Sequence, residues 1–258
     1  MSIIKRIMPV TMLAAALTSC SNKEEAQAND FNYVVDNFAD IQVLRYQVPG
    51  FENLSLEQKK LIYYLTEAAI SGRDILWDQN CAYNLPIRQV LEGIYTNYAG
   101  DKESADYKAF EKYLKQVEFA NGIHHHYSMD KFTPEFSQEF FIEAVKSLPT
   151  EQLPLAEGQD TDAFIAEITP VIFDPTVLAK RVNQAEGADL ITTSACNLYG
   201  GGITQAEVEQ YYNKLKDPKD QTPISYGLNS RLIKRDGKIE EEVYRVGGLY
   251  SPAIERIV

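Results

Sequence analysis

The chain has 258 residues, of which 45% are hydrophobic and 24% charged, and its 37 Asp+Glu outnumber its 25 Lys+Arg to give a net charge of -12. This composition excludes a disordered chain, a collagen-like chain and a membrane protein of several spans. The negative charge argues against a nucleic-acid partner, because such proteins need a basic face to displace counterions. The length suits one large domain or two small ones.

Residues 1–20 have the pattern of a lipoprotein signal peptide. Two basic residues precede an apolar run at 8–17 that is too short to span a bilayer, and residues 17–20 resemble a bacterial lipobox ending in Cys20. The alternative is an ordinary secretory signal with a chance cysteine. We expect lipidation of Cys20 and anchoring to the bacterial outer membrane, on its periplasmic or surface side. Residues 21–30 are small and polar, as in a flexible tether, and their acidic start resembles either a surface-export signal or a solvated linker.

The remaining cysteines and the histidines do not form a recognisable metal motif. Cys81 and Cys196 are too few for a disulfide framework, and whether they pair is not decided by the sequence. His124, His125 and His126 are consecutive, so their side chains diverge by about 100° in a helix or 180° in a strand and cannot all reach one ion. A polar loop is favoured over a zinc site, and this loop either lines a cleft or is exposed to solvent.

Helical spacing of apolar residues predicts a mostly helical N-terminal part. The segment 55–76 opens with a capping box at Ser55 and Gln58 and carries an apolar side. Residues 121–122, Asn-Gly, should end the helix before them. Six helix starts are predicted from cap residues and prolines, and they lie at Ser55, Asn84, Ser104, Thr133, Asp174 and Thr204.

The last part of the chain changes to β-structure. Residues 231–246 predict a β-hairpin around Asp236-Gly237, because both positions tolerate positive φ. The Gly-rich segment 197–202 is neither a P-loop nor a dinucleotide fingerprint, so a tight connection into the next helix is favoured over a substrate contact. These elements predict an α+β fold with a late β-hairpin or partial β-barrel.

A final short helix is predicted from Ser251-Pro252. The apolar residues 253–258 begin a hydrophobic stripe, and a helix of this length is marginal alone. We therefore expect the chain to be the N-terminal part of a longer protein, truncated at its C-terminus. The alternative is a short terminal helix docked on the core.

Several stretches together resemble the bacterial form of the dipeptidyl peptidase III family, metallopeptidase family M49. Residues 120–128, followed by 130–134, resemble the N-terminal lobe of that family. Residues 229–234, leading to 244–246, resemble the hairpin that follows there, and 197–209 lies between them in the matching order. Outside these stretches the resemblance is diffuse, and none of them is a catalytic signature.

The resemblance implies a two-lobed zinc exopeptidase that releases dipeptides from peptide N-termini, of which residues 31–258 would form the N-terminal portion. The family's zinc motif, H-E-x-x-G-H, is missing from this sequence. The zinc cofactor and the general base would therefore belong to downstream polypeptide, and this chain would be inactive alone. The residue that matches an aromatic near the substrate's N-terminal residues in the family is Tyr127.

Two other hypotheses differ in class from a peptidase portion. The chain would instead be a complete, non-catalytic surface lipoprotein that binds peptides or a protein partner through its aromatic surface. It would otherwise be a periplasmic structural protein. A downstream zinc motif in the coding sequence distinguishes the peptidase from both.

Overall fold

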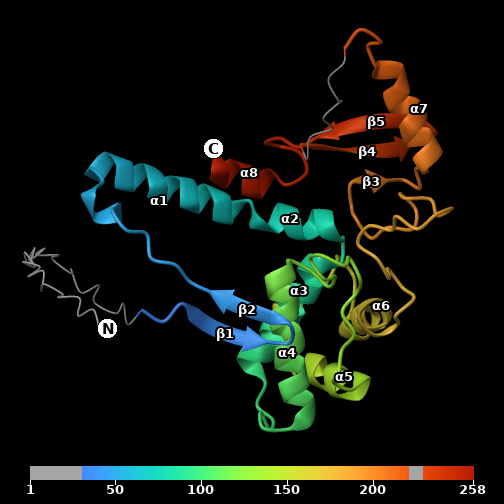
Figure 1. The fold of residues 1–258 in the computed structure, drawn as a ribbon. Coiled ribbons are helices and arrows are strands. Elements are labelled where there is room, and N and C mark those ends of the chain that lie inside the picture. The colour runs from blue at the N-terminus through green and yellow to red at the C-terminus, as the bar shows by residue number, and fades with distance from the viewer. Residues whose placement is uncertain (1–30, 221–228) are drawn as a thin grey trace, which may run out of the picture.

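A computed structural model describes residues 31–220 and 229–258 (Figure 1). The predicted signal peptide, the tether and Cys20 lie outside these ranges. The described chain is an α+β protein, as the sequence predicted. Its elements, in chain order, are β1 (Val34–Phe38), β2 (Ile41–Leu44), α1 (Leu56–Ser71), α2 (Arg73–Asn80), α3 (Asn84–Asn97), α4 (Ala105–Ala120), α5 (Gln138–Lys146), α6 (Thr161–Phe173), β3 (Tyr199–Gly200), α7 (Gln205–Leu215), β4 (Ser230–Arg235), β5 (Lys238–Val243) and α8 (Ser251–Ile257).

The strands form two small, separate sheets. β1 and β2 pair antiparallel, while β3 lies parallel to β4 and β4 antiparallel to β5. The predicted hairpin is confirmed, and its turn has positive φ at Asp236 (50°) and Gly237 (76°). Arg231 and Glu242 face each other across the hairpin with an ion pair of 2.7 Å. In the described residues these strands do not close a barrel.

Local capping sets several helix ends where the sequence placed them. Both capping boxes are formed, at Ser55 with Gln58 and at Thr204 with Glu207. α4 ends at Asn121, which adopts the left-handed conformation with φ 53°. The predicted segment 55–76 is divided into α1 and α2, because the chain breaks at Gly72.

The helix start predicted at Thr133 is wrong. α5 begins four residues later, because Ser137 is its N-cap and accepts the backbone N–H of Phe140. The backbone N–H of Ser137 donates in turn to the carboxylate of Asp106 on α4, at 2.8 Å. The cap is therefore fixed by a residue that lies distant in sequence.

The helix start predicted at Asp174 is also wrong, because Asp174 follows the end of α6, a helix that was not predicted from the sequence. α6 is capped by Asp160 and ends at Phe173. The Asp174 carboxylate accepts the backbone N–H and the hydroxyl of Thr176, at 2.8 and 2.7 Å. This local turn competes with helix formation beyond it.

The main hydrophobic core lies among α2 to α6. Its largest fully buried side chains include Trp77, Phe110, Tyr113 and Phe141. A second, small cluster joins α7 to the β3–β5 sheet through Ile203, Val208 and Leu232. The fold therefore carries a large helical core and a minor core under the late sheet.

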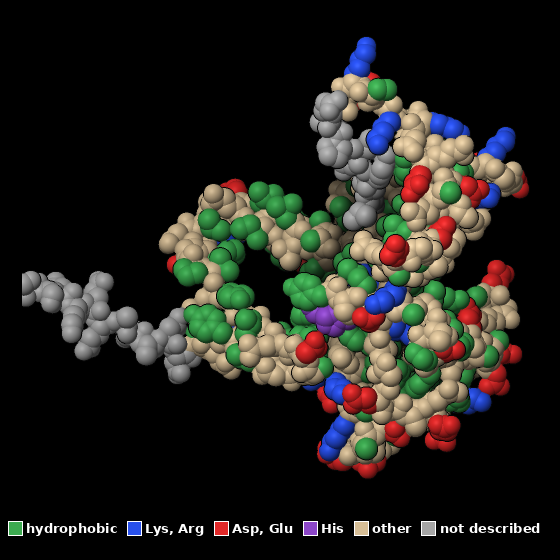
Figure 2. Space-filling view, turned by 45° about the vertical axis from the view of Figure 1, so that its right-hand side comes forward, with side chains coloured by type: hydrophobic (Ala, Val, Ile, Leu, Met, Phe, Trp, Pro, Cys, Tyr) green, Lys and Arg blue, Asp and Glu red, His purple; other side chains and the backbone are tan. Residues whose placement is uncertain are grey.

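Several exposed apolar side chains lie on α1. None of the residues of this helix is buried, and it packs against α8 (Figure 1). Figure 2 shows hydrophobic side chains along this part of the molecule. The exposed hydrophobic residues of α1 include Leu61, Ile62, Leu65 and Ile70. Within the ranges that the structure describes, none of the helices is both long and apolar enough to cross a membrane.

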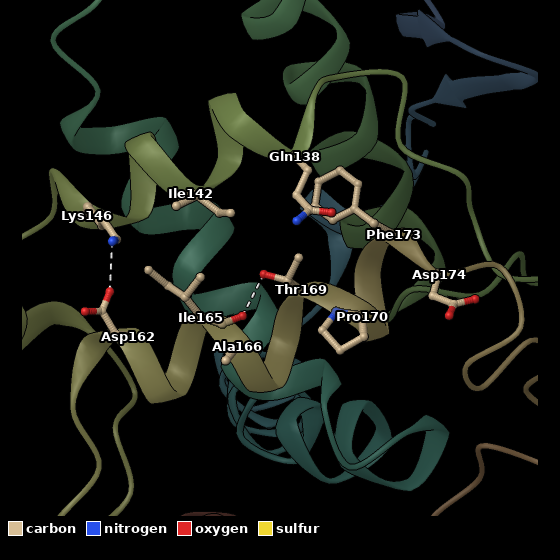
Figure 3. A pocket seen from close by; sticks show the side chains of 10 residues that line it. All are labelled: Gln138, Ile142, Lys146, Asp162, Ile165, Ala166, Thr169, Pro170, Phe173 and Asp174. Carbon is tan, nitrogen blue, oxygen red and sulfur yellow. Dashed lines mark hydrogen bonds and ion pairs between the residues drawn. The ribbon is translucent and has the colours of Figure 1, made fainter.

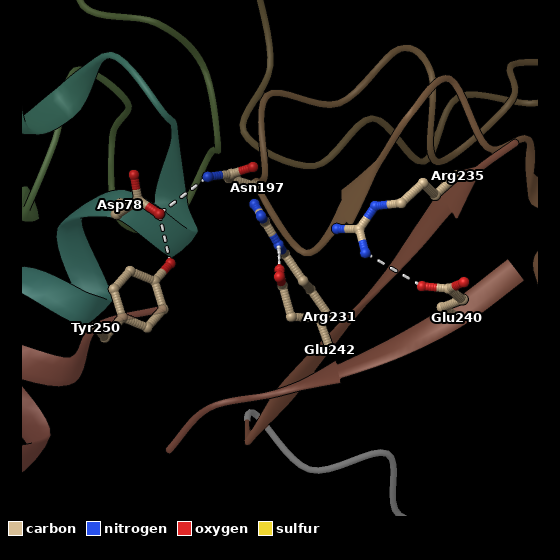
Figure 4. Close-up of polar contacts among 7 residues, drawn as sticks. All are labelled: Asp78, Asn197, Arg231, Arg235, Glu240, Glu242 and Tyr250. Atoms are coloured by element: carbon tan, nitrogen blue, oxygen red, sulfur yellow. Dashed lines mark hydrogen bonds and ion pairs between the residues drawn. The ribbon is translucent and has the colours of Figure 1, made fainter. Parts of the chain in front are cut away.

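The C-terminal segment is tied to α2 by a polar network (Figure 4). The Tyr250 hydroxyl donates to the carboxylate of Asp78, which also accepts the side-chain amide of Asn197 at 2.9 Å. Burial and this hydrogen bond raise the pKa of the Tyr250 phenol. One carboxylate on α2 thus connects the segment before β3 with the start of α8.

Replacing Tyr250 by Phe should detach α8 from α2. The variant leaves the Asp78 carboxylate with one donor fewer, so the free energy of unfolding should fall by about 1–2 kcal/mol. Amides of 251–257 should exchange with deuterium faster than in the wild type. Tyr46→Phe, which alters an exposed phenol, should change neither quantity, and equal exchange in all three proteins would contradict the role of Tyr250.

Candidate functional site

The three consecutive histidines lie on a loop between α4 and α5, and the first of them is structural. The His124 side chain is buried, with 2% exposure. Its Nε2 lies 2.7 Å from the carbonyl oxygen of Leu178, so Nε2 carries the proton and donates. Burial lowers the pKa of His124 to about 4, which keeps the ring neutral. The side chain fixes the loop against the segment after α6.

His125 organises the backbone of the loop tip. Its Nδ1 accepts the backbone N–H groups of Tyr127 and Ser128, both at 3.1 Å. The proton of the neutral ring is therefore on Nε2, which faces the carboxylate of Asp40 at 3.3 Å. Asp40 lies in the β1–β2 turn, so this sheet is held against the loop.

His126 belongs to an aromatic surface. Its ring stacks on that of His125, with centroids 4.5 Å apart, and lies 4.4 Å from the ring of Tyr127. Phe119, at the end of α4, contacts it edge-on at 5.2 Å. Burial, and next the proximity of His125, lower the pKa of His126.

These surroundings do not suit a zinc ion. His124 and His125 each use a ring nitrogen on backbone groups, and the rings of His125 and His126 lie stacked on each other. In the part of the chain that the structure describes, no group of three or more His, Cys, Asp and Glu side chains could hold a metal ion. The zinc that the family resemblance implies therefore does not fit these residues.

Tyr127, the predicted substrate-contacting residue, is the exposed tip of this loop. Its side chain is 82% exposed, whereas its backbone N–H is held by His125. The ring is thus presented to solvent from a fixed position. An exposed aromatic face of this kind can pack against an apolar side chain of a ligand.

A buried amide holds the start of the loop. Asn84, in the first turn of α3, donates from Nδ2 to the carbonyl oxygen of Trp77 at 3.0 Å and accepts the backbone N–H of Ile123 at 3.1 Å. Gly122 passes so close that a Cβ there would lie 2.1 Å from Asn84 Nδ2, and its φ is 143°. The sequence predicted a helix end at Gly122 but not its contact with Asn84.

A lysine holds the other end of the loop. The Lys131 ammonium donates to the carbonyl oxygens of Val171 and Val177, at 2.9 and 2.6 Å, and to that of Asp174. A cation stabilises the C-terminal end of a helix such as α6. The backbone N–H of Phe132 donates to the carbonyl oxygen of Ile123 at 2.9 Å, and this hydrogen bond closes the loop. No local sequence pattern indicated this role for Lys131.

The Gly-rich segment 197–202 is a tight connection, as the sequence favoured. A Cβ at Gly201, where φ is 69°, would lie 2.1 Å from the carbonyl oxygen of Lys234. Cys81 and Cys196 are free thiols, and burial raises the pKa of Cys81 to about 11. A high pKa keeps a thiol protonated and unreactive at neutral pH.

An open groove of about 590 Å³ lies between α5 and α6 (Figure 3). Its main polar groups already bind one another: Lys146 pairs with Asp162 at 2.8 Å, and the Thr169 hydroxyl donates to the Ile165 carbonyl at 2.6 Å. The groove therefore presents few free polar groups to a ligand. The histidine loop is the better candidate site, because its exposed aromatic group has a fixed position.

Comparison with known proteins identifies no family for this chain. No protein-family model matches the sequence, and no curated protein matches it.

Gly122→Ala should disrupt the loop. The new methyl group would clash with Asn84 and force a strained φ, so we expect a loss of more than about 2 kcal/mol in unfolding free energy. Gly158→Ala is a matched control, because Gly158 also has a positive φ but has open space around its Cα. This substitution should lower the free energy of unfolding by about 1–2 kcal/mol. Chemical denaturation measures both, and equal losses would contradict the close approach to Asn84.

His124 should make the fold sensitive to mild acid. The unfolded chain protonates this residue near pH 6.5, whereas the folded chain resists protonation until about pH 4, so stability falls as pH drops through this window. His124→Gln keeps a donor for the carbonyl oxygen of Leu178. Between pH 6.5 and 4 the free energy of unfolding of the wild type should fall by an amount on the order of 3 kcal/mol, and this fall should be absent from the variant. Urea unfolding at several pH values tests this. The same pH dependence in both proteins would contradict it.

Proposed function

We propose that this chain is the N-terminal portion of a zinc-dependent exopeptidase similar to dipeptidyl peptidase III. In this proposal the chain supplies one wall of a peptide-binding cleft, and the residues that hold zinc and cleave the peptide bond lie on downstream polypeptide. The enzyme is exported and anchored to the outer membrane through Cys20. The observation that carries the proposal is the histidine loop, whose sequence resembles that family and whose tip presents Tyr127.

The contacts of the loop support a binding role. Two backbone N–H groups on His125 Nδ1 fix the tip, and Asn84 and Lys131 fix its two ends. A loop held in this way loses little conformational entropy when a peptide binds. The Tyr127 ring then offers an apolar face to a side chain near the peptide's N-terminus.

Tyr127→Ala in the extended enzyme should raise KM for a dipeptidyl-naphthylamide by about three- to thirtyfold with little change in kcat. The physical reason is that the ring contributes apolar contact to substrate and transition state alike. Tyr46→Ala, which removes another exposed ring outside the histidine loop, is the matched control and should leave KM unchanged. If Tyr127→Ala alters neither KM nor kcat, Tyr127 is not part of the cleft.

The 258-residue chain alone should release no naphthylamide with zinc present, whereas the extended chain should. Release by the short chain would overturn the assignment of the chemistry to downstream residues. A coding sequence without a downstream H-E-x-x-G-H motif would favour the non-catalytic lipoprotein instead.

A further inference from the structure

Two free thiols lie beside one backbone contact between α2 and the segment before β3. The backbone N–H of Asn197 donates to the carbonyl oxygen of Gln79 at 2.9 Å. Cys196 directly precedes Asn197, and Cys81 follows Gln79 by two positions. The side chain of Asn197 also donates to Asp78 at 2.9 Å, although these two residues are 119 positions apart in the sequence (Figure 4). A distant part of the chain is thus tied to the end of α2, and it carries Cys196 with it.

The electrostatics of Cys81 agree with this contact. The Cys81 side chain is buried, with 1% exposure, and burial is the largest of the causes that raise the pKa of its thiol to about 11. The thiol of Cys196 also contributes to this increase in pKa. Electrostatic interactions weaken with distance, so such a contribution is expected from a neighbouring group. The backbone contact and the electrostatics therefore place both thiols in one region at the end of α2.

The two thiols differ in how far solvent reaches them. Cys196 is partly exposed, whereas Cys81 is buried. Burial raises the pKa of Cys196 as well, although the positive charge of Arg181 opposes this increase. A reagent in solution should therefore react at Cys196 first. Cys81 should react only with a group that Cys196 brings to it.

We propose that Cys81 and Cys196 are a disulfide-forming pair, which is oxidised by thiol–disulfide exchange with an external disulfide. In the first step, the Cys196 thiolate attacks one sulfur of the oxidant, a mixed disulfide forms, and one thiolate of the oxidant leaves. In the second step, the Cys81 thiol loses its proton and attacks the Cys196 sulfur, and the second thiolate of the oxidant leaves. The two cysteines lose two electrons and two protons, which the oxidant gains as it becomes two thiols.

This bond connects two parts of the fold. The large core among α2 to α6 and the small core under the β3–β5 sheet are separate clusters of buried residues. Cys81 directly follows α2, and Cys196 lies in the segment that leads into β3. The disulfide closes a loop of more than about 100 residues, which strongly restricts the unfolded chain. Oxidation therefore stabilises the fold and fastens the late sheet to the helical part. The proposal does not depend on the peptidase function.

Oxidation of the 258-residue chain with oxidised glutathione tests the proposal. The chain carries Cys20→Ser, so that Cys81 and Cys196 are its only thiols. After oxidation we expect a mass lower by two hydrogen atoms and, in a digest without reductant, a peptide that links Cys81 to Cys196. The midpoint of thermal unfolding should rise by about 5–15 °C. Dithiothreitol should reverse both changes, and a chain kept in dithiothreitol throughout is the reference.

Two single variants in the same background report how the bond forms. Cys81→Ala should gain one glutathione at Cys196, because no second thiol is present to resolve the mixed disulfide. Cys196→Ala should gain little glutathione, because Cys81 is buried. Neither variant should show the rise in the unfolding midpoint. The linked peptide and the midpoint of the chain with both cysteines do not depend on how well these variants fold.

Three results would overturn the proposal. A stable glutathione adduct on Cys196 in the chain with both cysteines would show that their Cα atoms do not come within the about 7 Å that a disulfide requires. A linked peptide that forms only in urea, or an oxidised chain with a lower unfolding midpoint, would show that the native fold does not accommodate the bond. A dimer linked through Cys196 would make this residue a surface thiol. These readouts are independent of naphthylamide release, so failure here and failure of the peptidase proposal are distinguishable.

Discussion

The buried side chain of Asn84 joins three segments at a point that water does not reach. Its amide donates to the end of α2, its carbonyl accepts from Ile123, and it stands in the first turn of α3. Gly122 can pass beside it only because a glycine has no Cβ. The buried amide and carbonyl groups of the Asn84 side chain are thereby paired. An apolar residue at this position would leave the backbone N–H of Ile123 without this acceptor. The direction in which the chain leaves α4, and so the position of the histidine loop, follows from this contact.

The three histidines show how one sequence pattern can supply three separate contacts. His124 is neutral and buried against Leu178, His125 gathers backbone donors at the tip, and His126 extends an aromatic surface to Phe119. None of these roles needs a metal. Together with Lys131 they leave Tyr127 as an exposed ring on a constrained loop. Such a loop suits recognition of a ligand, because its conformation is fixed before the ligand arrives.

Local signals in the sequence predicted the elements whose causes are local. Capping boxes at Ser55 and Thr204 and the Asp236-Gly237 turn involve residues only a few positions apart, and all three are formed. The helix starts predicted at Thr133 and Asp174 are wrong because other contacts determine where the neighbouring helices begin and end. One is the distant contact of Asp106 with Ser137, and the other is the local turn formed by Asp174 and Thr176. The consecutive histidines mark the loop in the sequence. Asn84 and Lys131 instead contact residues 39 and 40 or more positions away, so no local pattern indicates their roles.

Hydrogen–deuterium exchange of the histidine loop in the unliganded protein tests most directly whether it is constrained in advance. The amides of Ile123, His125 and Phe132 donate to Asn84, Asp130 and Ile123, respectively. These three amides should exchange as slowly as those in the middle of α3 and α4. Exchange at the rate of an exposed, unstructured loop would contradict this expectation, because the Tyr127 ring would then have no fixed position.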